Sequence, residues 1–260
     1  MIFCAISPCP NDTFIFDALI HKKIAFSHDL QPHFYDIEQL NTFALQKRFD
    51  LIKVSTAILH KIQDEYQLLT AGSAVGRGCG PQLISKNKSK IQSSSSIAIP
   101  GPHTTAKLLF DLFYPESKNQ IFMPYHTIFD AVMNDEVDAG LLIHEARFIA
   151  DNLPLCLQLD LGKLFEERFQ CMVPLGVIVA RRSLGKEVIN ELEQAIAASI
   201  QFARHHPESS QAFITQHAQE KDPVIIQKHI DLYVTSDSLS LSKEALYSIE
   251  ILLQNAGEQR

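Results

Sequence analysis

The sequence contains no apolar run close to the roughly 18–20 residues that a membrane-spanning helix needs. It also lacks an excess of basic residues, since 23 Lys and Arg stand against 30 Asp and Glu and give a formal charge of −7. Such a balance offers no counter-charge to a phosphate backbone, which excludes a dedicated nucleic-acid binder. Residues 1–6 are apolar but have no basic segment before them and no cleavage site after them, so no export signal is expected. We therefore expect a cytoplasmic protein with neither membrane nor nucleic acid among its partners.

Motifs of the common cofactor and metal enzymes are missing as well. The five cysteines are widely spaced without a C-x-x-C pair, so they indicate neither a zinc cluster nor a disulfide framework. The glycine cluster at residues 76–80 is followed by Pro81 and an extended run, whereas a dinucleotide-binding loop is followed by a helix. The zinc motif H-E-x-x-H is absent because Phe148 stands where the second histidine would be, and no P-loop or G-x-S-x-G occurs. These absences argue against a zinc cluster and against a nucleotide cofactor.

What the 260 residues do contain is an alternation of short strand-like and helical segments. Strands are predicted at residues 2–6, 33–37, 50–54, 97–100, 120–123 and 139–143, with helices at 12–19, 38–46, 104–113 and 127–134. This alternation is typical of parallel βαβ units. The last eighty residues read as almost wholly helical, with Val188, Leu192, Ile196 and Ile200 at the spacing of one buried face.

Two extended runs, at residues 81–85 and 174–180, bracket a complete α/β unit of the chain. The simplest fold is α/β with two lobes joined by two antiparallel crossover strands and a helical C-terminal section. Residues 1–84 and 181–260 would form the larger, discontinuous lobe, and residues 85–180 the smaller, inserted one. Ligands of open α/β sheets bind beyond the carboxyl ends of the strands, so residues just after strands in the cleft between the lobes become candidates.

His144 is the first such candidate, because it ends the apolar strand at residues 139–143. A histidine at that place could act as a general base near neutral pH, or it could be a structural histidine hydrogen-bonded at the rim. The other ten histidines are interpreted as solvated surface residues.

Hydroxyl side chains follow a strand in each predicted lobe. Thr104 and Thr105 come after a Gly/Pro turn at the start of a helix, where free N–H groups favour a carboxylate or phosphate. Ser55 and Thr56 occupy the equivalent place in the first lobe. Simple helix capping would explain either pair. Their position on opposite sides of one cleft favours a binding site.

Several motifs in a fixed order resemble a known enzyme family. They are Ser7-Pro8-Cys9-Pro10-Asn11-Asp12-Thr13-Phe14, Leu40-Asn41, Lys53-Val54-Ser55, Gly76-Arg77-Gly78-Cys79-Gly80-Pro81, Gly101-Pro102-His103-Thr104-Thr105-Ala106 and Ile143-His144-Glu145. Together they resemble the 1,4-dihydroxy-6-naphthoate synthases of the futalosine route to menaquinone. The resemblance extends from the first strand to about residue 181 and fades in the C-terminal helices.

The resemblance implies a two-lobed fold of the type II periplasmic-binding-protein kind, used as a cytoplasmic lyase without metal or cofactor. The implied substrate is cyclic dehypoxanthinyl futalosine, a carboxylated bicyclic ring fused to a sugar remnant. It implies that His144 accepts a proton. The implied substrate-binding residues are Ser55, Thr56, Ala57, Thr104, Thr105 and Asn41. Two departures are Pro102, where a basic residue is expected, and the aliphatic run at residues 56–59, where an aromatic is expected.

Three alternatives stay open at this point. The chorismate-dehydrating enzyme of the same pathway has a similar fold and also acts on a carboxylated ring. A solute-binding protein of a transporter would share the fold but act outside the cytoplasm. A cytoplasmic ligand-sensing module would bind tightly without turnover. The sequence also leaves open whether the C-terminal helices mediate a homodimer.

Overall fold

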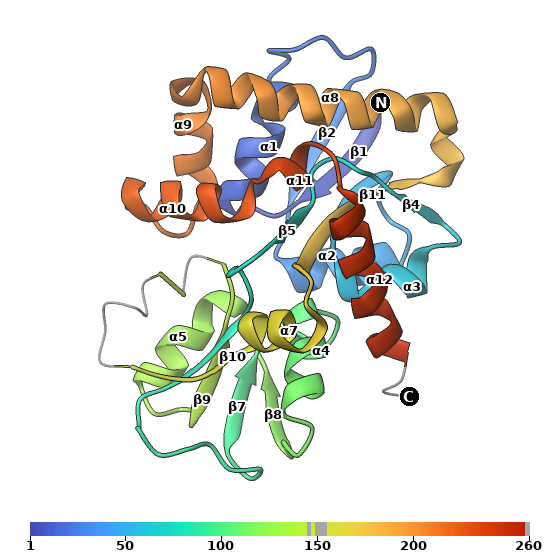
Figure 1. The fold of residues 1–260 in the computed structure, drawn as a ribbon. Coiled ribbons are helices and arrows are strands. Elements are labelled where there is room, and N and C mark those ends of the chain that lie inside the picture. Colours follow the sequence, from blue (N-terminus) through green and yellow to red (C-terminus); the bar gives the residue numbers. More distant parts are fainter. Residues whose placement is uncertain (145–146, 149–154, 258–260) are drawn as a thin grey trace.

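The computed structural model describes residues 1–144, 147–148 and 155–257, which form two helix-covered sheets in two lobes (Figure 1). The first sheet has the strand order β2-β1-β3-β11-β4, with β5 paired to β11. Its strands are β1 (Ile2–Ile6), β2 (Leu30–Phe34), β3 (Leu51–Ser55), β4 (Tyr66–Leu68), β5 (Ala74–Gly76) and β11 (Val173–Arg181). Strand β1 is parallel to β2 and β3, whereas β11 runs antiparallel to β3.

Helices cover both faces of this sheet because alternate side chains of its strands point to opposite sides. Along β1, Ile2, Cys4 and Ile6 enter one core, and Ala5 enters the other. The first core is closed by α1 (Pro10–Ile20), α8 (Lys186–His205), α9 (Pro207–His217) and α10 (Pro223–Tyr233). The second is closed by α2 (Ile37–Leu45), the 3-10 turn Thr56–Ile58, α3 (Leu59–Ile62) and α12 (Lys243–Gly257).

The second sheet has five strands in the order β10-β6-β9-β7-β8. They are β6 (Gln82–Ser85), β7 (Ser96–Ile99), β8 (Asn119–Phe122), β9 (Ala139–Leu142) and β10 (Cys156–Asp160). Strand β7 is parallel to β8 and β9, and β6 is antiparallel to β9 and β10. Helices α4 (Thr105–Phe113), α5 (Tyr125–Met133) and α7 (Leu161–Phe169) pack around it.

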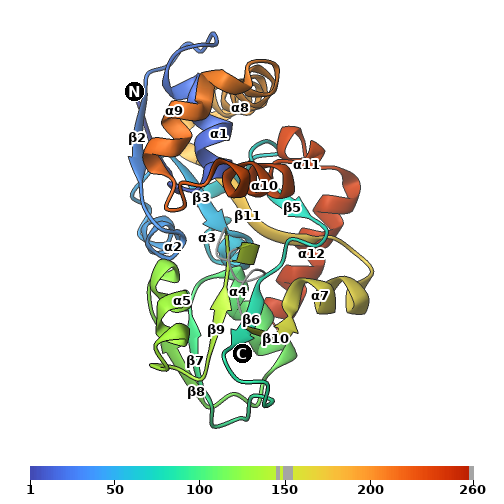
Figure 2. The same ribbon diagram turned by 90° about the vertical axis from the view of Figure 1, so that its left-hand side faces the viewer.

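The chain passes between the sheets twice, once between β5 and β6 and once between β10 and β11. The predicted two-lobed α/β fold is therefore confirmed, whereas the boundaries at residues 84/85 and 180/181 stay predictions. The C-terminal section is helical as expected, with 3-10 turn Arg182–Leu184 before α8 and α11 (Ser236–Leu239) before α12. Helix α12 descends along both lobes, so Ile249 lies in a core of the first and Leu252 in a core of the second (Figure 2). None of the described helices combines the length and the apolar character that crossing a membrane would need.

Candidate active site

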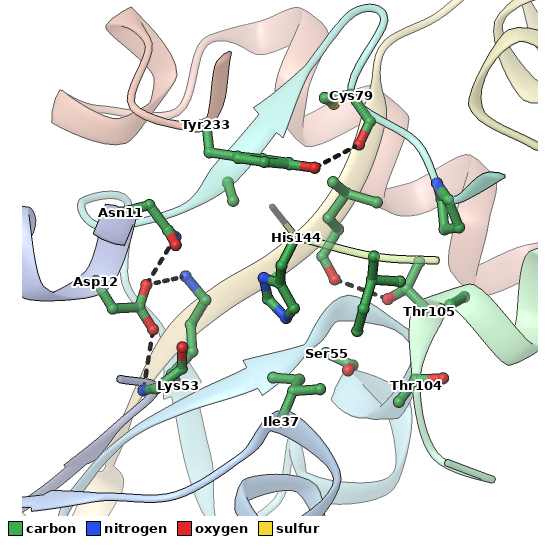
Figure 3. Close-up of a pocket in the computed structure, with 17 residues that line it drawn as sticks. Asn11, Asp12, Ile37, Lys53, Ser55, Cys79, Thr104, Thr105, His144 and Tyr233 are labelled. Atoms are coloured by element: carbon green, nitrogen blue, oxygen red, sulfur yellow. Dashed lines mark hydrogen bonds and ion pairs between the residues drawn. The ribbon is translucent and has the colours of Figure 1, made fainter. Parts of the chain in front are cut away.

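A cavity opens between the two sheets at the ends of β3 and β9 (Figure 3). It has an empty volume of about 630 Å³, counting the part open to solvent. Both lobes contribute to its wall, which consists of Ser7, Asn11, Asp12, Ile37, Lys53, Ser55, Ala74, Cys79, Pro81, Thr104, Thr105, Ala106, Ile143, His144, Leu175, Gly176 and Tyr233. The apolar wall with a few polar groups suits a ring-shaped ligand with polar substituents.

His144 lies in the turn after β9 and faces this cavity (Figure 3). Its φ of 56° puts a non-glycine residue in the left-handed region, a strained conformation of the kind that is found at active sites. Its ring lies 5.0 Å from the ring of Tyr125 and stacks at 12° on the ring of His229, with centroids 6.0 Å apart. Burial, assisted by the positive charge of Lys53, lowers the pKa of His144 to about 4, although Asp12 acts in the opposite direction. The imidazole is therefore neutral at neutral pH and can accept a proton.

A buried ion pair lies beside His144. The ammonium of Lys53, on β3, is 2.8 Å from the carboxylate of Asp12, on α1, and their side chains are 5% and 1% exposed. Asp12 also accepts hydrogen bonds from the side chain of Asn11 at 2.9 Å and from the backbone N–H of Ser7 at 3.1 Å. Both oxygens of this carboxylate are thus occupied, which fixes it at the start of α1.

His229, on α10, corrects the expectation that all histidines other than His144 are solvated. It is fully buried, and its Nε2 lies 2.9 Å from the side-chain oxygen of Asn11. Since the amide nitrogen of Asn11 donates to Asp12, its oxygen must accept, so His229 donates from Nε2. Burial, followed by the neighbouring His144, lowers the pKa of His229 well below its usual value. A chain of hydrogen bonds therefore connects the ion pair to the ring that stacks on His144.

In the first lobe, Ser55 faces the cavity, whereas the other residues predicted to bind the substrate there do not line it. The hydroxyl of Ser55 accepts from the amide of Asn41 at 2.9 Å, and the N–H of Ser55 donates back at 2.8 Å. Asn41 is fully buried and also donates to the carbonyl of His103 at 3.2 Å. Among the described residues, Thr56 and Ala57 do not line the cavity, and the buried hydroxyl of Thr56 has no hydrogen-bond partner.

In the second lobe, Thr104 and Thr105 line the cavity, but each hydroxyl proton already has an acceptor. Thr104 donates to Gly101 at 2.9 Å while it caps α4 through Lys107. Thr105 donates to the carbonyl of Leu175 at 2.8 Å and accepts from Ala57 at 3.3 Å. The backbone N–H groups of the first two residues of α4 have no acceptor in the described part of the chain. An anion at this end of the cavity would therefore be held by backbone N–H groups rather than by the hydroxyls.

A polar contact spans the lobes at the edge of the cavity. Glu38, on α2, accepts from the backbone N–H of His103 at 3.0 Å and lies 2.5 Å from its Nδ1. Burial raises the pKa of Glu38, although its bonds to His103 act in the opposite direction. Pro102, where a basic residue is expected, is exposed and does not line the cavity.

The described side chains provide neither a cluster of metal ligands nor a reactive thiol in the cavity. No group of three His, Cys, Asp or Glu residues in that part of the chain could hold a metal ion. Burial raises the pKa of the Cys79 thiol to about 12, so this thiol is not a nucleophile at neutral pH.

Lys53, Asp12 and His229 are the site residues that the sequence analysis missed as functional. A signal for Lys53 exists, because it is the one charged residue in a strand whose other members are buried. A lysine is almost never fully buried unless its charge is paired. His229 precedes the buried Ile230 and follows Ile226 by three positions, so it lies on the buried face of its helix.

The chain is similar to known proteins over nearly its whole length. A family model described as menaquinone biosynthesis matches residues 2–258. The chain is 39% identical to a 1,4-dihydroxy-6-naphtoate synthase of Streptomyces coelicolor, over 98% of this chain and 92% of the relative. It is 38% identical to the Thermus thermophilus enzyme of the same name, over 96% of this chain and 92% of the relative.

Solved structures show the same fold. A crystal structure from Archaeoglobus fulgidus superimposes with a TM-score of 0.93 at 31% identity, over 99% of this chain and 97% of that one. A Candida albicans protein described as having the generic periplasmic binding protein fold superimposes with a TM-score of 0.67 at 14% identity, over 99% and 90%. The second likeness concerns the fold alone.

Proposed function

The chain belongs to the menaquinone biosynthesis family and is an enzyme of menaquinone synthesis, and on this premise we propose that it is a 1,4-dihydroxy-6-naphthoate-forming lyase. Its substrate in this proposal is cyclic dehypoxanthinyl futalosine. The observation that carries the proposal is His144, a neutral histidine on a strained turn that faces a cavity of ring-binding character.

The two ends of the cavity suit two parts of this substrate. The backbone N–H groups at the start of α4 favour the ring carboxylate. The apolar wall, with Ile37 and Leu175, packs against the bicyclic ring. This orientation presents the sugar remnant and its ketone to His144 at the opposite end, beside Asp12 and Lys53.

Catalysis begins with removal of a carbon-bound proton next to the ketone. His144 accepts this proton, and the C–H bonding electrons form the double bond of an enolate. In the elimination that follows, the enolate re-forms the carbonyl group, a carbon–carbon double bond forms, and a C–O bond at the neighbouring carbon breaks with its electron pair leaving on the oxygen, which opens the sugar remnant. Formation of the aromatic naphthoate ring drives the reaction forward. As a biosynthetic enzyme of this kind, the protein would act in the cytoplasm.

The decisive experiment mixes the purified protein with cyclic dehypoxanthinyl futalosine and follows dihydroxynaphthoate by chromatography and mass spectrometry. We expect product only in the presence of the protein. Binding of the substrate without product would favour a binding module, and turnover of chorismate instead would favour the dehydrating enzyme of the pathway.

The base assignment is tested with His144→Asn, which keeps a polar side chain but cannot accept a proton. We expect turnover to fall by at least about 100-fold, the lower range for a lost general base, while substrate affinity changes by only a few-fold. Calorimetry separates the two quantities. Loss of affinity with an unchanged kcat would contradict the assignment.

A further inference from the structure

Lys53 is a buried, charged residue of the cavity whose chemistry the reaction as proposed so far does not use. It stands in the middle of β3 between Ile52 and Val54, which are fully buried, and is itself 4% exposed. Its ammonium has three N–H donors, and in the described part of the chain only the Asp12 carboxylate accepts from it. Two donors therefore remain for a ligand. A buried N–H donor without an acceptor would destabilise the folded protein.

The surrounding backbone is shaped around this side chain. A Cβ atom added at Gly176, on the neighbouring β11, would lie 2.9 Å from Cε of Lys53. Gly176 also lines the cavity. Because it has no side chain, it leaves room for the side chain of Lys53 to reach the cavity. Both oxygens of Asp12 are already occupied, which holds the ammonium at one point of the wall next to His144 (Figure 3).

The proposed proton abstraction needs a partner of this kind. The pKa of His144 near 4 makes it a weak base for a carbon-bound proton, so the enolate that forms must be stabilised at its oxygen. The hydroxyls of Thr104 and Thr105 cannot serve, because their protons are donated to Gly101 and Leu175.

We propose that Lys53 is a second catalytic residue, which donates a hydrogen bond from its ammonium to the substrate ketone oxygen and stabilises the enolate. As His144 takes the proton, the C–H electron pair forms the carbon–carbon double bond, and the carbonyl π electrons move to the oxygen that Lys53 contacts. The ammonium keeps its protons throughout, and Asp12 is a positioning residue that holds it. This inference rests on the proposed lyase function. The competing explanation is that Lys53 and Asp12 form a purely structural ion pair.

The test compares variants that separate these two roles. Lys53→Met/Asp12→Asn removes both charges at once, which avoids a buried unpaired carboxylate. Asp12→Asn alone removes the carboxylate and keeps the ammonium. Lys53→Gln keeps a donor toward Asp12 without the charge and serves if the double variant is unstable. The matched control is Lys23→Met/Asp17→Asn, which removes another ion pair of α1, one with a 1% exposed carboxylate, outside the cavity.

The Tm of each variant is measured first, and kcat and KM are then measured at a temperature well below that Tm. We expect Lys53→Met/Asp12→Asn to lose roughly 100- to 1,000-fold in kcat with KM changed by a few-fold, as for removal of one oxyanion donor. Asp12→Asn should lose much less, and the control should lose stability only.

A folded Lys53 variant with kcat within about threefold of the unaltered protein, or with a raised KM alone, would overturn the catalytic role. An equal kcat loss in Asp12→Asn would overturn it too, because the carboxylate would then carry the effect. If the unaltered protein forms no naphthoate, the lyase function itself fails and the Lys53 assignment fails with it.

Discussion

The ring of His144 is surrounded by groups that decide its protonation. Asp12 and Lys53 face it from α1 and β3, and Tyr125 and His229 contact it from α5 and α10. Burial is the largest influence and keeps the charged form unfavourable, and the ammonium of Lys53 adds to it. The ring is therefore poised to receive a proton rather than to hold one at rest.

This environment predicts the pH dependence of the reaction. Because His144 must be neutral to act, kcat/KM should fall only as pH drops toward its pKa of about 4. Between pH 7 and pH 5 we expect little change, whereas an ordinary histidine with a pKa of ~6.5 would leave only ~3% of the activity at pH 5.

Initial rates at subsaturating substrate, with circular dichroism to verify folding at each pH, measure this dependence. A midpoint near 6.5 would show that the ring is not desolvated in the working enzyme. In Lys53→Met the midpoint should shift upward, because the positive charge of Lys53, which lowers the pKa of His144, has been removed while Asp12, which raises it, remains.

At the residue scale, the sequence patterns predicted the cavity residues that follow strands. They did not predict the residues that contact those residues from other parts of the chain. His144 and Ser55 were predicted from their positions after strands, and both face the cavity. The roles of Asp12 and His229 depend on contacts between α1, β3 and α10, and the contact between Asn11 and His229 joins residues that are 218 positions apart. Spacing along the chain carries no information on such contacts.

At the element scale, β11 is the strand on which the geometry of the site depends. It pairs with β3 so that Gly176 is opposite Ser55 and Val177 opposite Val54, which lays its glycine beside the lysine stem. A strand interior rarely favours glycine unless another group approaches closely. Here that group is Lys53.

Gly176→Ala should therefore impair catalysis through Lys53. The added methyl would lie 2.9 Å from Cε of Lys53 and 3.3 Å from the carbonyl of Val54, so the lysine stem must shift. We expect kcat to fall about tenfold, the effect of a misplaced catalytic group, with a loss of about 1–3 kcal/mol in the free energy of unfolding. Steady-state kinetics and denaturant unfolding measure both.

Gly76→Ala is the matched control. Its added Cβ would meet its neighbours at 3.6 Å or more, an ordinary contact, in the strand that pairs with the same β11. Equal losses of kcat in the two variants would mean that the strand pairing, and not the lysine, is disturbed.

The elements themselves were largely predictable because their apolar patterns are strong. The predicted strand at residues 2–6 coincides with β1, and the buried stripe of α8 is confirmed at Leu192, Ile196 and Ile200. Strand β2 begins and ends three residues before the predicted one, and it includes Pro32, which is tolerated because β2 is an edge strand. The short strands β4 and β5 were not predicted, because three residues carry too little pattern to be distinguished from a loop.

At the scale of the whole molecule, the cavity exists only because the two lobes lie against each other. Glu38 and Asn41 of α2 contact His103 in the second lobe, and Thr105 donates to Leu175 in the segment that returns to the first. Gly101 permits this approach, because a Cβ there would lie 2.3 Å from Oε2 of Glu38. The amino-acid sequence predicts two lobes from its pattern of strands, but the contacts that join them depend on their relative placement.

Glu38→Ala should weaken substrate binding more than catalysis. The substitution removes the acceptor of two His103 donors, one of them 2.5 Å away, and leaves His144 and Lys53 in place. Hydrogen bonds to a charged group contribute ~1.5–3 kcal/mol, and 1.4 kcal/mol corresponds to a tenfold change in affinity. Because the pair is partly exposed, we expect a rise in KM of about tenfold and a kcat within a few-fold of normal.

Glu65→Ala provides the comparison, because Glu65 pairs with Lys47 inside the first lobe and spans no cleft. It should leave KM unchanged. If Glu38→Ala lowers kcat instead and leaves KM untouched, the contact with His103 orients the reacting groups and does not hold the lobes together. If KM rises in Glu38→Ala and not in Glu65→Ala, the substrate binds to lobes that are already joined. Without the contact between Glu38 and His103, part of the substrate's binding energy must then be used to bring the lobes together.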